Sequence, residues 1–178
     1  MKKLLFSVLA AMLLLVSLTG FASVATGVTD PEVLKDLAAV RQATVKYHDV
    51  SIALADGYIR TPHCIQEPGL GGMGIHFINP ARIMNPAINL LEPEILLYVE
   101  TEDGMKLIGV EYMYPIGRPD APVPNPAPPS PILFGRAFDG PMLGHEPGMP
   151  PHYDLHAWVW QANPNGIFAP FNPNVSCP

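Results

Sequence analysis

The sequence predicts an α+β fold in which an N-terminal helix packs on an antiparallel β-sheet or partial barrel with long Pro/Gly-rich loops. One segment, residues 30–56, has helical periodicity. After Gly57 the apolar pattern changes to a period of two, in short runs bounded by proline and glycine. Few helical stretches separate these runs, which favours antiparallel over parallel pairing.

The predicted helix has a start and a stop signal. Asp30 is a suitable N-cap, Pro31 suits the first helical position, and Gly57 can end the helix. A break near His48 and Asp49 would divide it into two helices. The predicted buried stripe consists of Leu34, Leu37, Arg41, Val45, His48, Ile52 and Ala55. Val33, Val40 and Thr44 lie beside it.

Five strands are predicted, at residues 75–78, 95–99, 106–114, 132–134 and 154–160. Residues 101–104 are predicted to form the hairpin turn between the second and the third strand. In the third strand, alternation places Leu107, Gly109, Glu111 and Met113 on one face and Ile108, Val110 and Tyr112 on the other. Residues 115–131 hold eight prolines and predict an extended surface loop, and residues 135–151 are also rich in glycine and proline.

Residues 1–25 have the layout of a signal peptide. Lys2 and Lys3 precede an apolar run, and Ser23, Val24 and Ala25 provide small residues for cleavage. The run is shorter than the roughly 20 residues that span a bilayer. Residues 26–178 are therefore expected to form a single secreted or periplasmic domain with no stable membrane anchor after processing; the alternative is a retained N-terminal anchor.

Charge and cysteine content narrow the partners and the compartment. The formal net charge is −6, and it becomes −8 without Lys2 and Lys3. No cluster of lysine and arginine offsets this charge, so nucleic acid is excluded as a partner. Cys64 and Cys177 are expected to form a disulfide in an oxidising compartment, the alternative being two free thiols.

The glycine run 69–74 matches the dinucleotide-binding pattern G-x-G-x-x-G. That motif needs a preceding strand and a following helix, whereas here Pro68 precedes it and the strand-like residues 75–77 follow. No nucleotide cofactor is therefore expected, and the glycines are predicted to shape a tight loop that orients His76.

The stretch HYDLHAWVW, residues 152–160, predicts one wall of a site. As a strand, it places five side chains on one face: His152, Asp154, His156, Trp158 and Trp160. The α-carbons of His152 and His156 would be roughly 13 Å apart, and those of Asp154 and His156 about 6.6 Å. Asp154 is therefore expected to pair with His156, with His152 at the entrance and the tryptophans as an apolar wall.

A metal site is the leading functional hypothesis, with zinc or copper held by His76, Glu111, Asp154 and His156. Trp158, Trp160 and His152 are the candidate ligand-binding residues. Whether the protein is an enzyme stays open; Glu111 and His156 are the candidate catalytic groups for proton transfer, in metal-assisted hydrolysis or isomerisation.

Two alternatives are a metal-free pocket for a small polar ligand and a non-catalytic cell-envelope or glycan-binding module. The module would use the Pro-rich loop and exposed aromatic side chains near Trp160, Phe168 and Phe171. Imidazole and carboxylate groups that converge within about 4 Å in a concave pocket favour a site over a module.

Several stretches together resemble a family of short, uncharacterised exported bacterial proteins. They include GGMGIHFINPA, LIGVEYMYP, HYDLHAWVWQANPNGIFAPFNP and the final VSCP, and the resemblance covers nearly all of the chain after residue 25. It implies an exported bacterial protein and brings no activity or ligand.

Overall fold

The computed structural model describes residues 28–85 and 87–178 and has an α+β fold, as predicted. The predicted signal peptide lies outside the described residues. The main sheet is antiparallel throughout, with the strand order β1-β2-β3-β4-β8-β7. Its strands are β1 (Ile59–Glu67), β2 (Gly71–Ile78), β3 (Ile95–Thr101), β4 (Gly104–Pro115), β7 (Asp139–Met142) and β8 (His152–Ala157). A small hairpin pairs β5 (Ile132–Leu133) with β6 (Arg136–Ala137).

The N-terminal helical segment is divided, as its sequence allowed. It comprises α1 (Pro31–Thr44), a 3-10 turn η1 (Val45–His48) and α2 (Val50–Ala55). Asp30 caps α1 by accepting a hydrogen bond from the Glu32 amide, and Asp49 caps α2 in the same way. A third, short helix, α3 (Pro80–Ile83), follows β2.

The predicted helix stripe is wrong in phase. In α1 and η1 the buried residues are Val33, Leu37, Val40, Thr44 and Tyr47, whereas Leu34, Val45 and Ile52 are exposed. The buried face of α1 therefore follows residues 33, 37, 40 and 44 and is rotated from the predicted stripe through Leu34 and Arg41.

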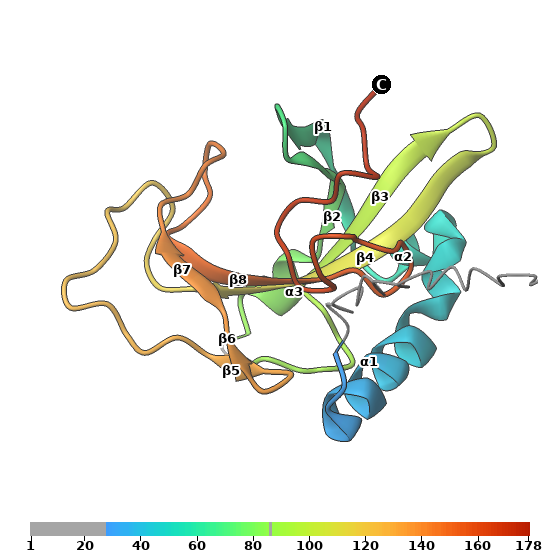
Figure 1. Ribbon diagram of the computed structural model, residues 1–178. Coiled ribbons are helices and arrows are strands. Elements are labelled where there is room, and N and C mark those ends of the chain that lie inside the picture. Colours follow the sequence, from blue (N-terminus) through green and yellow to red (C-terminus); the bar gives the residue numbers. More distant parts are fainter. Residues whose placement is uncertain (1–27, 86) are drawn as a thin grey trace, which may run out of the picture.

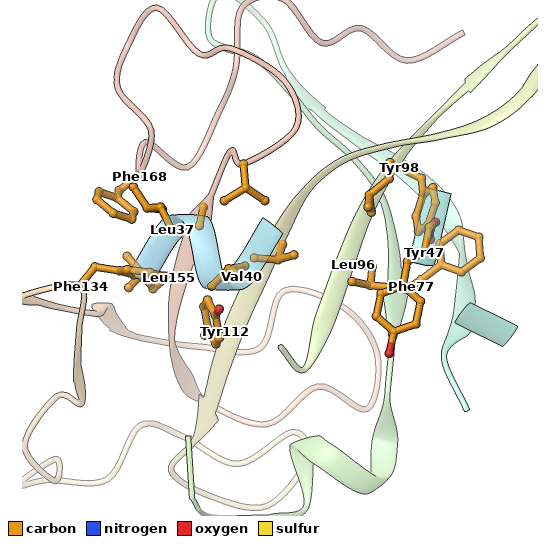
Figure 2. Close-up of a cluster of buried hydrophobic side chains, with 14 of the residues drawn as sticks. Leu37, Val40, Tyr47, Phe77, Leu96, Tyr98, Tyr112, Phe134, Leu155 and Phe168 are labelled. Carbon is orange, nitrogen blue, oxygen red and sulfur yellow. Dashed lines mark hydrogen bonds between the residues drawn. The ribbon is translucent and has the colours of Figure 1, made fainter. Parts of the chain in front are cut away.

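The larger core lies between the N-terminal helices α1 and α2 and one face of the sheet (Figure 1). Leu37 and Val40 of α1 pack over Tyr112 and Leu155, while Tyr47 packs near Tyr98 (Figure 2). Buried tyrosine hydroxyls here donate to backbone carbonyls: Tyr98 to Tyr47 at 2.6 Å and Tyr112 to Leu90 at 2.7 Å. These bonds satisfy the polar ends of large apolar side chains.

A smaller apolar cluster covers the other face of the sheet. It contains Ile95, Leu97, Ile108, Met113, Trp158 and Val175. Val175 belongs to the C-terminal tail, which crosses β2 through a bridge between Gly72 and Asn172. The Cys64–Cys177 disulfide, predicted from the sequence, joins this tail to β1.

The disulfide also indicates where the chain folds. Its two cysteines are 113 residues apart in sequence, and the described chain contains no free cysteine. Stable disulfides are typical of oxidising compartments outside the cytoplasm, so this bond is consistent with an extracytoplasmic protein.

A β-bulge in β4 overturns part of the predicted alternation. Leu97 pairs with Gly109 and Tyr98 with Leu107, so Ile108 is the extra residue. Leu107 therefore belongs to the helix-side core and Ile108 to the opposite cluster, the reverse of the prediction. Beyond the bulge, Glu111 and Met113 share the second face as expected.

The glycine run, predicted to be a tight loop, is divided: Gly69 and Leu70 lie in the turn between β1 and β2, and the run from Gly71 onwards belongs to strand β2. A Cβ at Gly72 would lie 2.8 Å from a side-chain carbon of Val175, and one at Gly74 would lie 2.5 Å from the Tyr98 carbonyl oxygen. The absence of a side chain at these glycines therefore lets the C-terminal tail pack against Gly72 and β3 approach Gly74 closely. The sequence analysis also missed β1, β6 and β7, which contain charged residues or proline.

The Pro-rich segment is a loop without helix or strand after Pro115, which still belongs to β4. It is attached to β8, because the Tyr153 hydroxyl donates to the Pro128 carbonyl at 2.7 Å and the Ile116 amide to the Pro151 carbonyl at 2.8 Å. Among the described residues, no helix combines the length and apolar character needed to cross a membrane.

Candidate metal centre

Three strands place His76, Glu111 and His156 on the sheet face opposite helices α1 and α2. Glu111 of β4 and His156 of β8 are directly paired residues. His76 comes from β2 and reaches past β3, which lies between β2 and β4. The strand pairing therefore aligns side chains that are 35 and 45 positions apart in the sequence.

The three side chains converge closely. Each offers one nitrogen or oxygen ligand atom within 4.8 Å of the other two. Glu111 Oε2 lies 3.1 Å from His76 Nε2 and 3.7 Å from His156 Nε2. Ligand atoms around a tetrahedral zinc ion are about 3.4 Å apart, given bonds of about 2.1 Å. The group has a composition and a spacing that could hold a metal ion.

Burial makes this convergence energetically significant. Among the described residues, the buried side-chain atoms without a hydrogen-bond partner all belong to four residues: Glu111, His152, Asp154 and His156. They include Glu111 Oε2 and both ring nitrogens of His156. Each such group costs about 1 to 3 kcal/mol when it stays unpaired, so their concentration at one place points to a bound partner.

The charge of Glu111 is set by two opposing effects. Burial alone would raise the pKa of its carboxyl, but the facing imidazoles of His156 and His76 outweigh burial and hold this pKa below its usual range. Glu111 is therefore ionised at neutral pH, which is the state a cation ligand requires.

His152 and Asp154 form a second polar pair on β8. The His152 Nδ1 lies 2.9 Å from the Pro150 carbonyl oxygen, which can only accept, so this nitrogen carries the proton. Its Nε2 lies 3.8 Å from Asp154 Oδ2, too far for a hydrogen bond. Burial alone would lower the pKa of His152, but the nearby Asp154 carboxylate and the Pro150 carbonyl outweigh burial and raise that pKa.

These contacts correct the predicted pairing on β8. Asp154 has its close ionisable contact with His152 and none within 4.0 Å with His156. His152 is fully buried and therefore not an entrance residue. Asp154 and His156 share a face as predicted, but the neighbouring strand supplies Glu111, which lies closer to His156 than Asp154 does.

The two tryptophans separate. Strand β8 ends at Ala157, so the alternation assumed through Trp160 stops before either tryptophan. Trp158 remains beside the site, with its ring stacked 6.3 Å from that of His156. Trp160 does not belong to the site, because its indole donates to Thr44 Oγ1 and its ring contacts His48 on the helix side.

A cavity of about 920 Å³ opens over this face and includes His76, Glu111 and Asp154 in its lining. Its walls come from segments that sequence analysis did not assign to a site. They include β1 residues 61–63 and 65, the end of α3 at residues 83–84, and the loop 145–150. These segments are irregular in sequence and carried no periodic signal.

The aromatic residues of the alternative module are not exposed. Phe168 is buried, and Trp160 and Phe171 are half-buried. The polar set instead converges in a concave pocket, the observation expected of a site.

Comparison of the chain with known proteins finds no matching family model, curated protein or solved structure.

Proposed function

We propose that this is a small exported metal-binding protein in which His76, Glu111 and His156 hold a transition-metal ion. Zinc is the favoured ion and copper the alternative, since imidazole suits both. The convergence of three ligand atoms within 4.8 Å, at a place where buried polar atoms have no other partner, carries the proposal.

Two histidines and one carboxylate are a ligand set that zinc enzymes use with a fourth position open to water or substrate. An ion bound in this way acts as a Lewis acid and lowers the pKa of bound water to about 7. His76, Glu111 and His156 would then be ligands, so Asp154 is the buried cavity carboxylate left to accept a proton. Metal-assisted hydrolysis or isomerisation is the reaction class that follows.

One observation favours a metal-free alternative. The 3.1 Å between Glu111 Oε2 and His76 Nε2 is also short enough for proton transfer between the two side chains. In that case the cavity would bind a small polar ligand beside this pair, without an ion.

Metal analysis separates the two possibilities. Untagged protein recovered after export should contain about one zinc or copper ion per chain. His156→Ala and Glu111→Gln should lose the ion, while His48→Ala, an exposed histidine on the helix side, should keep it. Chelation should lower the unfolding temperature of the wild type but not of His156→Ala, since a ligand at about 100 times its Kd adds about 2.7 kcal/mol.

A wild-type protein that stays metal-free when zinc and copper are supplied would contradict the metal proposal and leave the proton-transfer pair. Retention of the ion by both His156→Ala and Glu111→Gln would show that it binds elsewhere. Circular dichroism checks that each variant is folded.

We also propose that the chain is exported to the periplasm or the medium and belongs with the short exported bacterial proteins that its motifs resemble. The disulfide supports the compartment. N-terminal sequencing of the exported chain should give Thr26 as its first residue, and an intact Met1 would contradict processing.

A further inference from the structure

The cavity over the metal centre has two chemically different parts. Its floor holds His76, Glu111 and Asp154, whereas its walls are mostly apolar. The described lining contains no lysine or arginine. The other ionisable lining residues are His63, His145 and Glu146, so a phosphate or another multiply charged anion would find no permanently cationic side chain there, and a largely apolar ligand would fit better.

Methionines form much of the apolar wall. Met73, Met84, Met113 and Met149 all line the cavity, with Ile83 beside Met84. Methionine side chains are flexible and adapt to ligands of different shape. Met84 is 84% exposed, so a large apolar side chain stands at the opening of the cavity and faces solvent. This wall offers a path for an apolar chain from solvent to the floor.

The floor imposes a requirement on the ligand's polar end. Asp154 is 4% exposed, lines the cavity, and its Oδ1 has no hydrogen-bond partner. Along β8 its α-carbon is about 6.6 Å from that of His156. A head group at this depth can therefore donate a hydrogen bond to Asp154 while one of its oxygens occupies the open metal position.

We propose that the cavity binds a hydrophobic small molecule whose polar end combines a metal-binding oxygen with a hydrogen-bond donor. The apolar part lies along the methionine wall, and the polar end reaches the metal centre and Asp154. This inference rests on the proposed metal site and names the ligand class of that same site. A volume of about 920 Å³ is ample for a molecule of this kind.

A homologous series of hydroxamic acids tests the proposal, because a hydroxamate carries a metal-binding oxygen and an N–H donor on an alkyl chain of chosen length. Zinc-loaded protein is titrated calorimetrically with acetohydroxamic, butanohydroxamic, hexanohydroxamic and octanohydroxamic acid. The affinity should rise with each buried methylene, by up to about fourfold, until the chain fills the wall.

Two sets of variants locate the two ends of the ligand. Met84→Ser/Met149→Ser should leave the affinity for acetohydroxamic acid unchanged and reduce the gain with chain length. Leu143→Ser is the matched control, since Leu143 is 60% exposed and outside the cavity lining, and it should behave as wild type. Asp154→Ala should weaken every member of the series by a similar factor, roughly two- to tenfold.

The outcomes separate this inference from the metal proposal. Zinc-loaded wild type that binds acetohydroxamic and octanohydroxamic acid equally well would overturn the ligand class and leave the metal site intact. A chain-length gain that the double methionine variant retains would also overturn it. A protein that binds no zinc would overturn both proposals together.

Discussion

Buried carboxyl groups at Glu111 and Glu94 differ in charge because their neighbours differ. The imidazoles of His156 and His76 keep the pKa of Glu111 low against burial. Glu94 has no imidazole beside it: its Oε2 accepts a hydrogen bond from the Met113 amide at 3.3 Å. Burial dominates at this position and raises the pKa of Glu94 to about 7.

Glu94 should therefore make stability depend on pH. The folded state prefers the protonated carboxyl, so its contribution is complete below the usual pKa of about 4.5 and is lost as the pH rises through about 7. Between pH 5 and pH 8 the wild type should lose about 2 kcal/mol relative to Glu94→Gln. Urea denaturation at the two pH values measures this difference.

Glu102→Gln is the control for the loss of one negative charge, since Glu102 lies exposed in the β3–β4 turn. A stability difference between wild type and Glu94→Gln that stays constant from pH 5 to pH 8 would refute the protonation of Glu94 in the folded state.

At the level of elements, glycines and a bulge decide how the strands fit together. The bulge at Ile108 resets which face each β4 residue occupies. In β2, Gly74 has a φ of +90° and lies close to the Tyr98 carbonyl of β3. The bulge lies in the strand that carries Glu111, and Gly74 lies in the strand that carries His76. A substitution that shifts the register of either strand would therefore displace the candidate ligands.

Gly74→Ala should destabilise the protein more than a positive φ alone explains. Gly104 also has a positive φ, of +111°, but a Cβ there meets no atom within 4 Å. Gly104→Ala should cost about 1 to 2 kcal/mol, the strain of the backbone alone. Gly74→Ala should cost at least about 2 kcal/mol more or prevent folding. Equal unfolding midpoints in urea for the two variants would show that the contact with Tyr98 is unimportant.

In the whole molecule, the sheet separates two environments. Helices α1 and α2 and the larger core cover one face (Figure 1). The candidate metal centre and its cavity, with α3 in the cavity wall, lie on the other face. The disulfide is anchored in β1, the strand whose residues 61–63 and 65 line the cavity, while Cys64 itself packs against the larger core. It also holds the C-terminal tail over Gly72 of β2.

Removal of this disulfide should lower global stability. The bond closes a loop between residues 113 positions apart. Chain entropy gives an upper value of about 4.7 kcal/mol for a loop of about this length. Cys64→Ser/Cys177→Ser should lose a large part of that free energy of unfolding in urea, and wild type in reductant should behave like the variant. Unchanged unfolding midpoints in both would mean that tail and β1 hold together without the bond.

Several features follow from sequence because their causes are local. The Asp30 and Pro31 signals start α1, the 101–104 turn joins β3 and β4, and alternation places Glu111 and Met113 on the same face. The pairing of Cys64 with Cys177 followed from counting, since only two cysteines are present. Each of these depends on neighbouring residues or on a simple count.

The features that the sequence did not predict depend on contacts between segments far apart in the chain. The cavity walls come from β1, α3 and the loop 145–150, whose sequences gave no common pattern. The partner of His156 was misassigned because strand spacing compares residues only within one strand. Which residue stands on the adjacent strand depends on register, and the register of β4 against β8 placed Glu111 there.

The sequence by itself determined the fold class, the disulfide and the residue types of the candidate site, because periodicity, turn chemistry and composition are local properties. Only the tertiary structure decided that Asp154 stands outside the group of His76, Glu111 and His156 and turns to His152, and that Trp160 belongs to the helix side. The physical reason is that strand register, the β4 bulge and the end of β8 at Ala157 are fixed by packing between segments far apart in the chain.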